Sequence, residues 1–339
     1  MTSKFNEIYN ASIKNPEDFW KNVSEDIFWF KKPTKILNKS NPPFYKWFED
    51  GVTNTCYNAL DFHIERGKGD KLALIYDSPI TNNKAKFTFT ELKGKVSKFA
   101  GALDNLGVKK GDRVIIYMPM VPEAVVAMLA CGRIGAIHSV VFGGFASNEL
   151  ASRIDDSKAK ILITASCGFE PGRTVEYRPL IDGALKIAKH KVDKVIFFQR
   201  KDHEIKLNAP REISWDEALA NSKDMDCIEM SANDYAYILY TSGTTGTPKG
   251  IVRDIGGHIV ALKWTMKNIY NIDEEDVWWS ASDIGWIVGH SYIVYGEAVP
   301  NGFCWFVARC CRKSNRVREI WNPMNAECYD FGRIEKETQ

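Results

Sequence analysis

Short apolar runs alternate with longer amphipathic stretches from about residue 70 onward. Six of these runs are rich in branched and aromatic residues and have the length of buried strands, so we predict a strand in each. They are Lys71–Tyr76, Arg113–Met118, Ala136–Phe142, Lys160–Thr164, Lys194–Phe198 and Tyr235–Tyr240. Strands separated in this way by helical patterns indicate an α/β protein whose strands are largely parallel. We therefore expect layered sheets with flanking helices.

The stretches between the predicted strands carry apolar residues three or four positions apart, as on one face of a helix. The first such face consists of Leu92, Val96, Phe99, Leu103 and Leu106. Thr90 is expected to cap this helix, and Gly107 to end it, because glycine adopts the left-handed conformation at little cost. Further helices are predicted after Pro122 and over 147–155 and 179–189.

Residues 1–65 show a different pattern, which is rich in aromatic residues and mostly helical. Asn15 is a suitable cap for a helix with Pro16 in its first position, and Pro42 and Pro43 break the chain again. The pattern indicates an N-terminal extension that wraps around a larger body.

Composition narrows the choice of partners. The formal net charge is only +2 and no long basic run is present, which argues against nucleic acid or an acidic membrane as a partner. We find no apolar run long enough for a membrane span and no signal peptide, and therefore expect a cytoplasmic protein. The eight cysteines lack the spacing of a zinc site and are expected to be reduced thiols.

The stretch TSGTTGTPKG, residues 241–250, directly follows the last predicted strand. Its glycines let backbone N–H groups converge on an anion, its hydroxyls add hydrogen-bond donors, and Lys249 adds a positive charge. This combination predicts a polyphosphate site rather than an ordinary surface loop. It is not a Walker A loop, because Pro248 and Gly250 stand where that motif needs glycine and a hydroxyl residue. The chain has no GxGxxG motif after a predicted strand, so the sequence does not support a dinucleotide site.

These features resemble the adenylate-forming superfamily, which includes acyl-CoA synthetases, luciferases and the adenylation domains of peptide synthetases. TSGTTGTPKG resembles the signature phosphate loop of that superfamily, and the stretch from Tyr76 to Arg173 is similar to short-chain acyl-CoA synthetases throughout. The segments NPPFYKWF, NTCYNALD, SCGFEPGR and ASDIGWIVGHSYIVYG look most like the propionyl-CoA synthetase branch. The expected fold is an incomplete N-terminal domain of this superfamily.

The resemblance implies a two-step reaction that uses ATP, CoA and Mg²⁺. The carboxylate of a short-chain acid attacks the α-phosphorus of ATP, which gives an acyl-adenylate and pyrophosphate, and the thiol of CoA then displaces AMP. The residues implied to contact the ATP phosphates are Thr241, Ser242, Gly243, Thr244, Thr245, Gly246 and Lys249. Mg²⁺ offsets negative charge in such a step, but no metal ligand is identified in this chain.

A second segment matches family positions that line the acyl pocket. These positions are Trp286, Ile287 and Val288, and Val288 also matches the tunnel for the pantetheine arm of CoA. The position of Val288 is usually threonine in the acetate branch, so an apolar residue there favours propionate. The preference is expected to be weak, because one methylene is worth only about 1–3 kcal/mol.

A third segment, GFEPGR, matches the place where the acetate branch binds the 3′-phosphate of CoA. Arg173, preceded by Gly172, matches one of two arginines found there, and Glu170 replaces the other. A clamp of two arginines is therefore not expected.

Two further residues have expected roles outside these segments. Arg153 is expected to form a salt bridge. His290 is expected to be a packed, hydrogen-bonded histidine, with a place on the substrate path as the alternative.

The resemblance covers about residues 5–296 and ends after Gly296. We therefore divide the chain into an extension (1–65), a partial AMP-binding domain (66–296) and a non-matching tail (297–339) without clear strand–helix alternation. The family's adenine, ribose and metal motifs and its catalytic lysine are not found, so no catalytic residue is assigned and little or no synthesis is expected from this truncated chain alone. The alternatives are a non-catalytic nucleotide- or CoA-binding remnant and an acetyl-CoA synthetase.

Overall fold

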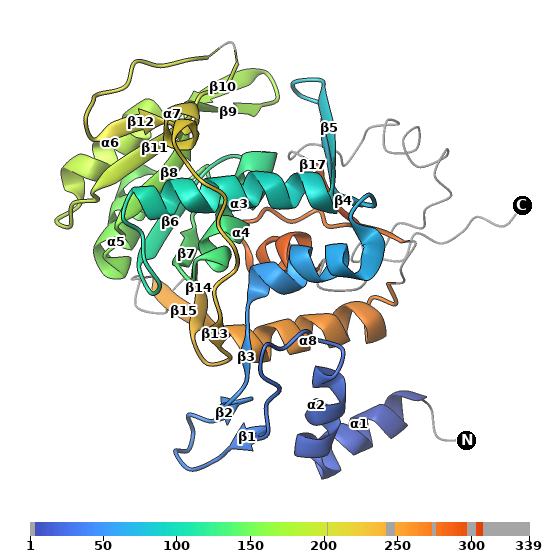
Figure 1. The fold of residues 1–339 in the computed structure, drawn as a ribbon. Helices are drawn as coiled ribbons and strands as arrows, with labels where there is room; N and C mark the ends of the chain where they lie inside the picture. The colour runs from blue at the N-terminus through green and yellow to red at the C-terminus, as the bar shows by residue number, and fades with distance from the viewer. Residues whose placement is uncertain (1–3, 202, 242–247, 273–275, 297–302, 308–339) are drawn as a thin grey trace, which may run out of the picture.

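The computed structural model describes the chain except for residues 1–3, 202, 242–247, 273–275, 297–302 and 308–339. The expected α/β class is confirmed: two larger sheets are packed with helices, and an N-terminal extension lies against the body (Figure 1). None of the described helices is both long enough and apolar enough to cross a membrane.

The larger sheet has seven strands. In spatial order they are β12 (Glu212–Ser214), β11 (Lys194–Phe198), β8 (Ile161–Ala165), β6 (Arg113–Tyr117), β7 (Ile137–Val140), β14 (Tyr235–Thr241) and β15 (Lys249–Asp254). Every neighbouring pair is parallel except β14 and β15, which form an antiparallel hairpin. The carboxyl ends of the parallel strands therefore meet at one edge of the sheet.

Helices cover both faces of this sheet. They are α3 (Phe89–Asn105) and α4 (Pro122–Arg133) on one face, and α5 (Ser147–Ser157) and α6 (Arg178–Ile187) on the other. Adjacent residues of β6 show why both faces are apolar. Ile116 is buried with α3 and α4, whereas Ile115 is buried with α5 and α6, because successive side chains of a strand point to opposite faces.

Helix α3 begins two residues earlier than the sequence suggests. Thr88 caps it instead of Thr90: the Oγ1 of Thr88 accepts a hydrogen bond from the backbone N of Glu91 at 3.2 Å, and the Glu91 carboxylate accepts one from the backbone N of Thr88 at 2.8 Å. This reciprocal pair needs glutamate three residues after the cap, which Thr88 has and Thr90 lacks. Gly107 lies just past the helix with φ +82°, as predicted.

A second sheet contains four strands. They are β16 (Val277–Trp279), β17 (Phe303–Val307), β4 (Leu72–Ser78) and β5 (Asn83–Thr88), in that spatial order. Strand β17 lies between β16 and β4 and is parallel to both. Strand β17 lies in the segment 297–339 that was assigned to the non-matching tail, and it was not predicted from its apolar run FCWFV.

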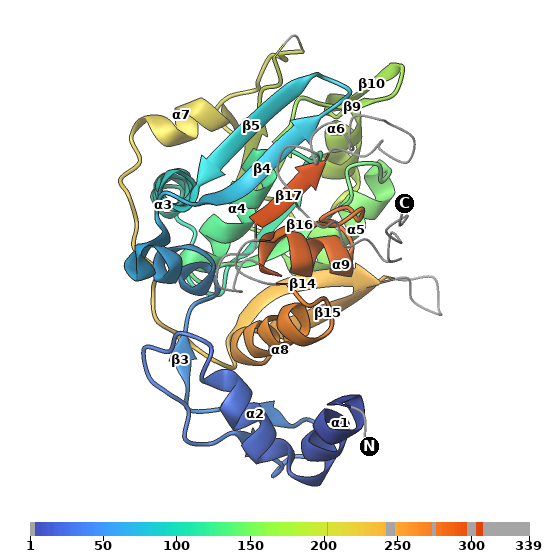
Figure 2. The same ribbon diagram turned by 90° about the vertical axis from the view of Figure 1, so that its right-hand side faces the viewer.

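The first part of the N-terminal extension lies below α8 (Ile255–Asn268), at the bottom of the molecule in both views, whereas its end lies higher, beside α3 (Figure 2). The extension contains α1 (Lys4–Lys14), α2 (Pro16–Ser24), β1 (Leu37–Asn38), β2 (Lys46–Trp47), β3 (Val52–Thr53) and the π-helices η1 (Tyr57–Asp61) and η2 (Ile64–Lys68). As predicted, Asn15 caps α2. The rings of Trp20 and Trp264, 6.2 Å apart, join α2 to α8.

Candidate functional site

A cavity of about 70 Å³ lies at the carboxyl edge of the larger sheet. Segments that directly follow four parallel strands line it: Pro119 and Met120 after β6, Phe142–Gly144 after β7, Gly168–Glu170 after β8, and Arg200 after β11. The remaining lining residues are Tyr76, Ser78, Thr81, Val175, Tyr177 and Asp283. In sheets of this kind, ligands bind outside the carboxyl ends of the strands. The cavity is therefore the candidate site.

Two glycines allow the segments around the cavity to approach closely. A Cβ on Gly143 would lie 2.1 Å from the hydroxyl of Tyr177, and a Cβ on Gly285 would lie 3.0 Å from the backbone of Phe142. The first distance is far below van der Waals contact, so even alanine at position 143 would have to displace Tyr177, which is buried. Gly143 thus sets the width of the cavity on this side.

The predicted CoA segment forms a hairpin of β9 (Cys167–Glu170) and β10 (Arg173–Glu176). Gly172 occupies the turn with φ +76°. Arg173 lies opposite Glu170, and an Nη2 of Arg173 is 2.7 Å from Oε2 of Glu170. Both side chains are exposed, so this ion pair contributes only about 0–1 kcal/mol and an anionic ligand could replace it at little cost.

Arg200 is a candidate that the sequence analysis missed. Only 8% of it is exposed, and its guanidinium lies 4.8 Å from the ring centre of Phe169. Among the carboxylates that the structure describes, none lies within salt-bridge distance of Arg200. A buried cation in the cavity wall without such a partner is suited to an anionic group. The only signal in the sequence is its position two residues after a predicted strand.

The predicted acyl-pocket residues lie next to the cavity. Trp286 directly precedes the short helix α9 (Ile287–Gly289) and is 49% exposed, and Ile287 is 47% exposed. Val288 is partly buried. The ring of Trp286 lies 6.0 Å from that of Phe142 and 6.2 Å from that of Phe145. The apolar surface of Trp286, Ile287 and Val288 lies next to the cavity, and it is suited to a short alkyl chain.

His290 belongs to a buried polar cluster below this surface. Its Nε2 is 3.0 Å from Nε2 of His138, and the hydroxyl of Tyr295 is 3.1 Å from the same His138 nitrogen. Burial, assisted by nearby His258, lowers the pKa of His138 to about 3, and burial also lowers the pKa of His290 well below its usual value. His290 is therefore a neutral, packed and hydrogen-bonded histidine, the first of the two expected roles.

The predicted phosphate loop connects β14 to β15. Thr241, the last residue of β14, lies opposite Lys249, the first residue of β15, and both are exposed at the open end of the hairpin. The predicted contacts Ser242, Gly243, Thr244, Thr245 and Gly246 lie outside the described residues. An exposed hydroxyl facing an exposed lysine fits the phosphate end of ATP.

Two contacts hold this hairpin against α5. The hydroxyl of Tyr240 donates a hydrogen bond of 2.6 Å to Asp156, and the guanidinium of Arg153 lies 5.2 Å from the ring centre of Tyr240. Arg153 also forms the expected salt bridge, with Glu149 at 2.7 Å. Within the part of the chain that the structure describes, no group of three metal-ligating side chains gathers at the hairpin, so a complete Mg²⁺ donor set is not found there.

Known families match almost the whole described chain. A model of the AMP-binding enzyme family matches residues 62–319, and a model of the acetyl-coenzyme A synthetase N-terminus matches residues 5–59. The chain is 54% identical over 295 residues to the human protein named "Acyl-CoA synthetase short-chain family member 3, mitochondrial", which is 87% of this chain and 43% of that protein. It is 44% identical over 306 residues to an acetyl-coenzyme A synthetase of Xylella fastidiosa, covering 88% of this chain and 47% of that enzyme.

A solved structure has the same fold. The acetoacetyl-CoA synthetase from Streptomyces lividans matches 97% of this chain and 50% of its own length with a TM-score of 0.84, at 23% identity. The chain thus spans about half the length of the relatives it matches.

The relatives also correct one expectation. Five mammalian relatives that are 53–55% identical to the chain are named as mitochondrial proteins, so the expected cytoplasmic location is wrong. An average composition and the lack of a recognisable signal peptide were insufficient grounds for that expectation. Two family models and relatives of more than 40% identity agree with the fold. The chain therefore belongs to the AMP-binding enzyme family, among its short-chain acyl-CoA synthetases.

Proposed function

We propose that this chain supplies the phosphate-, acyl- and CoA-contacting part of an ATP-dependent short-chain acyl-CoA synthetase. The observation that carries this proposal is the placement of Thr241 opposite Lys249 at the carboxyl end of β14. Strand β14 is the neighbour of β7, after which the cavity segment Phe142–Gly144 follows. A triphosphate at the hairpin and an acid near Trp286 would thus approach each other along one sheet edge.

In this proposal, three positively charged side chains, Lys249, Arg173 and Arg200, offset negative charge on the substrates. The ammonium of Lys249 and the hydroxyl of Thr241 hold the terminal phosphates of ATP, which keeps the α-phosphorus open to the acid's carboxylate. Bound Mg²⁺ would supply further charge neutralisation for the leaving pyrophosphate. Arg173, directly after Gly172 in the turn, gives up its ion pair with Glu170 and binds a phosphate of CoA instead. Arg200 adds a second positive charge at the cavity.

The proposed acid is propionate. Trp286, Ile287 and Val288 would contact its alkyl chain, and Val288 would also border the path of the pantetheine arm. Partly buried Val288 offers methyl groups where the acetate branch has a hydroxyl, which favours one additional methylene. The human relative is named as a short-chain family member and as mitochondrial, which supports both a short-chain acid and a mitochondrial location.

The direct test is the exchange of labelled pyrophosphate into ATP, measured on the full chain with propionate, acetate or butyrate. We expect ATP to bind and acid-dependent exchange to be slow but highest with propionate, because these residues correspond to only 43% of the human relative. Calorimetric titration with ATP and CoA accompanies the assay.

The other outcomes separate the alternatives. Binding of ATP and CoA without any exchange would favour a non-catalytic binding protein. Exchange that is fastest with acetate would favour an acetyl-CoA synthetase. Steady hydrolysis of ATP to ADP would contradict adenylate chemistry altogether.

A further inference from the structure

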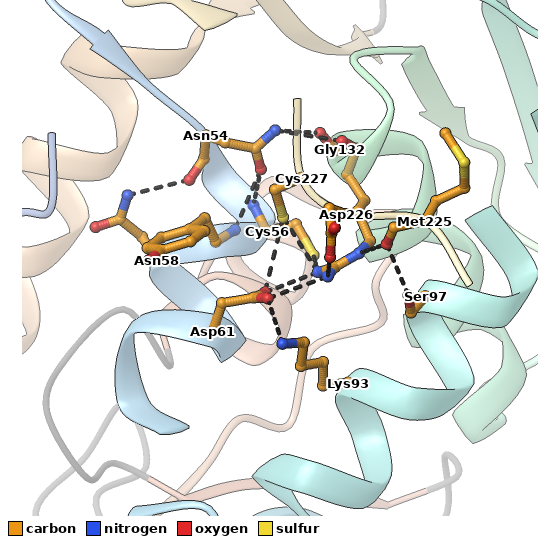
Figure 3. Close-up of polar contacts among 12 residues, drawn as sticks. Asn54, Cys56, Asn58, Asp61, Lys93, Ser97, Gly132, Met225, Asp226 and Cys227 are labelled. Atoms are coloured by element: carbon orange, nitrogen blue, oxygen red, sulfur yellow. Dashed lines mark hydrogen bonds and ion pairs between the residues drawn. The ribbon is translucent and has the colours of Figure 1, made fainter. Parts of the chain in front are cut away.

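Two cysteines that are distant in sequence meet around one buried arginine (Figure 3). Cys56 directly precedes η1 in the N-terminal extension. Cys227 lies in the strap, which we define as residues 221–229, between α7 (Trp215–Ala220) and β13 (Met230–Ser231). Arg133, the last residue of α4, lies between them. None of these residues takes part in the proposed acyl-CoA chemistry.

The guanidinium of Arg133 holds the cluster together. Arg133 is fully buried, and its Nη1 and Nη2 lie 2.7 and 3.0 Å from the two carboxylate oxygens of Asp61. The same Nη1 lies 3.1 Å from the sulfur of Cys227 and 3.5 Å from the sulfur of Cys56. The two sulfur atoms lie within 4.8 Å of each other. A small movement of the side chains would therefore bring the sulfurs into bonding distance.

Cys56, Asp61 and Cys227 offer three atoms that could bind a metal ion, but the charges around them disfavour a cation. Arg133 already contacts both oxygens of Asp61, and Nζ of Lys93 lies 2.9 Å from one of them. A metal cation would have to enter between these two positive side chains. The same charges instead stabilise a thiolate, which is the nucleophilic form of cysteine.

The two thiols differ in their tendency to lose a proton. Burial alone would raise the pKa of Cys56, but a hydrogen bond from Cys227 and the charge of Arg133 outweigh it, so the pKa of Cys56 is lowered. Burial and the neighbouring Cys56 raise the pKa of Cys227. Cys56 is therefore the thiol of the pair that loses its proton more readily. Cys131 is equally buried without such a neighbour, and burial raises the pKa of its thiol.

We propose that Cys56 and Cys227 form a reversible disulfide when the protein meets a peroxide. Cys227 is partly exposed and Cys56 is not, so Cys227 is the sulfur that the oxidant reaches. The proton of Cys227 passes to the Cys56 thiolate, and the resulting Cys227 thiolate attacks one peroxide oxygen; the O–O bond breaks, which leaves a sulfenic acid on Cys227 and releases hydroxide. The sulfur of Cys56 then attacks the Cys227 sulfur and the S–S bond forms, while the hydroxyl group of the sulfenic acid leaves with the Cys56 proton as water. Two electrons pass from the thiols to the peroxide.

The disulfide would fasten the strap covalently. At present polar contacts hold it: Oγ of Ser97 donates to the carbonyl of Met225 at 2.7 Å, and Nδ2 of Asn54 donates to the carbonyl of Ile228 at 2.9 Å. The strap leads through β13 into β14, the strand that ends at the phosphate hairpin. Oxidation would thus restrain the segment that precedes the proposed nucleotide site.

The test uses the full chain, treated with hydrogen peroxide at low molar excess, alkylated and digested without reductant. We expect mass spectrometry to find the peptides of Cys56 and Cys227 linked, with the loss of two hydrogens, and the link to disappear with dithiothreitol. The thermal midpoint of the oxidised chain should rise by roughly 5–10 °C, because the bond closes a long loop.

Matched variants complete the test. Cys131→Ser should retain the linked peptides, because Cys131 lies outside the cluster, and Cys227→Ser should lose them and the rise in thermal midpoint. The proposal is overturned if peroxide takes Cys227 of the unmodified chain to sulfinic or sulfonic acid without a link to Cys56. It is equally overturned if Cys56 links to another cysteine at the same rate when Cys227 is present.

Discussion

Replacing Asp61 with alanine is expected to lower the free energy of unfolding by about 3–5 kcal/mol, since it leaves a buried guanidinium without its carboxylate. Arg133 has no solvent exposure, and both of its terminal nitrogens contact Asp61. The carboxylate joins η1 to the end of α4, so its loss also loosens the N-terminal extension. The measurement is the midpoint of equilibrium urea unfolding, followed by tryptophan fluorescence.

Asp226 provides a matched control for this substitution. Its Oδ1 lies 4.0 Å from Nη2 of the same Arg133, but the side chain is fully exposed. Asp226→Ala removes the same charge and is expected to change stability very little, because water screens an exposed ion pair. Similar losses from Asp61→Ala and Asp226→Ala would show that burial does not determine the strength of this interaction.

Replacing Lys263 with methionine is expected to stabilise the protein near neutral pH. Lys263 lies in α8 with only 3% exposure, and burial lowers its pKa to about 7. In the unfolded chain its pKa lies near 10.5, so between these values the unfolded state binds more protons. Stability contributed by this residue therefore rises as pH increases from about 7 to 10. At pH 7 the buried lysine costs on the order of 4 kcal/mol, which Lys263→Met should recover.

The pH dependence distinguishes this effect from a general gain in packing. The difference in unfolding free energy between Lys263→Met and the unmodified chain should decrease steadily from pH 7 to pH 10. Lys267, one turn further along α8, is exposed and lies 3.6 Å from Asp26. Lys267→Met removes the same charge from an exposed position of the same helix and should change stability little. A difference for Lys263→Met that stays constant across this range would mean that Lys263 is not neutral in the folded protein at high pH.

Five of the seven strands of the larger sheet, all except β12 and β15, could be predicted from sequence, most clearly where both faces of a strand are buried. Such strands appear as short continuous apolar runs, as in β6 and β8. The hairpin partner β15 could not be predicted in the same way, because five of its six residues are exposed and its sequence KGIVRD is mixed. Strand β17 was missed because it follows Gly296, where the resemblance to the family was judged to end. Its composition, FCWFV, is that of a strand.

The candidate site was only partly predictable. The phosphate loop and the hairpin around Arg173 carry local residue patterns, so they could be located without a structure. Arg200 carries no pattern and becomes meaningful only when parallel strands bring it to the cavity of Gly143 and Tyr177. The pairing of Arg133 with Asp61 is equally non-local, because 72 residues separate the partners.

The binding of ATP to two single-charge variants tests the central claim, that the hairpin of β14 and β15 holds the phosphates of a nucleotide. Lys249 and Arg253 lie on the same exposed strand, but Lys249 is at the open end and Arg253 lies opposite Tyr237. Lys249→Met and Arg253→Met cause the same change in net charge. By calorimetric titration, Lys249→Met should weaken ATP binding by roughly 10- to 100-fold, as expected for a lost charge-assisted hydrogen bond, and Arg253→Met by less than about threefold. Equal weakening in both variants, or unchanged affinity in Lys249→Met, would contradict the account.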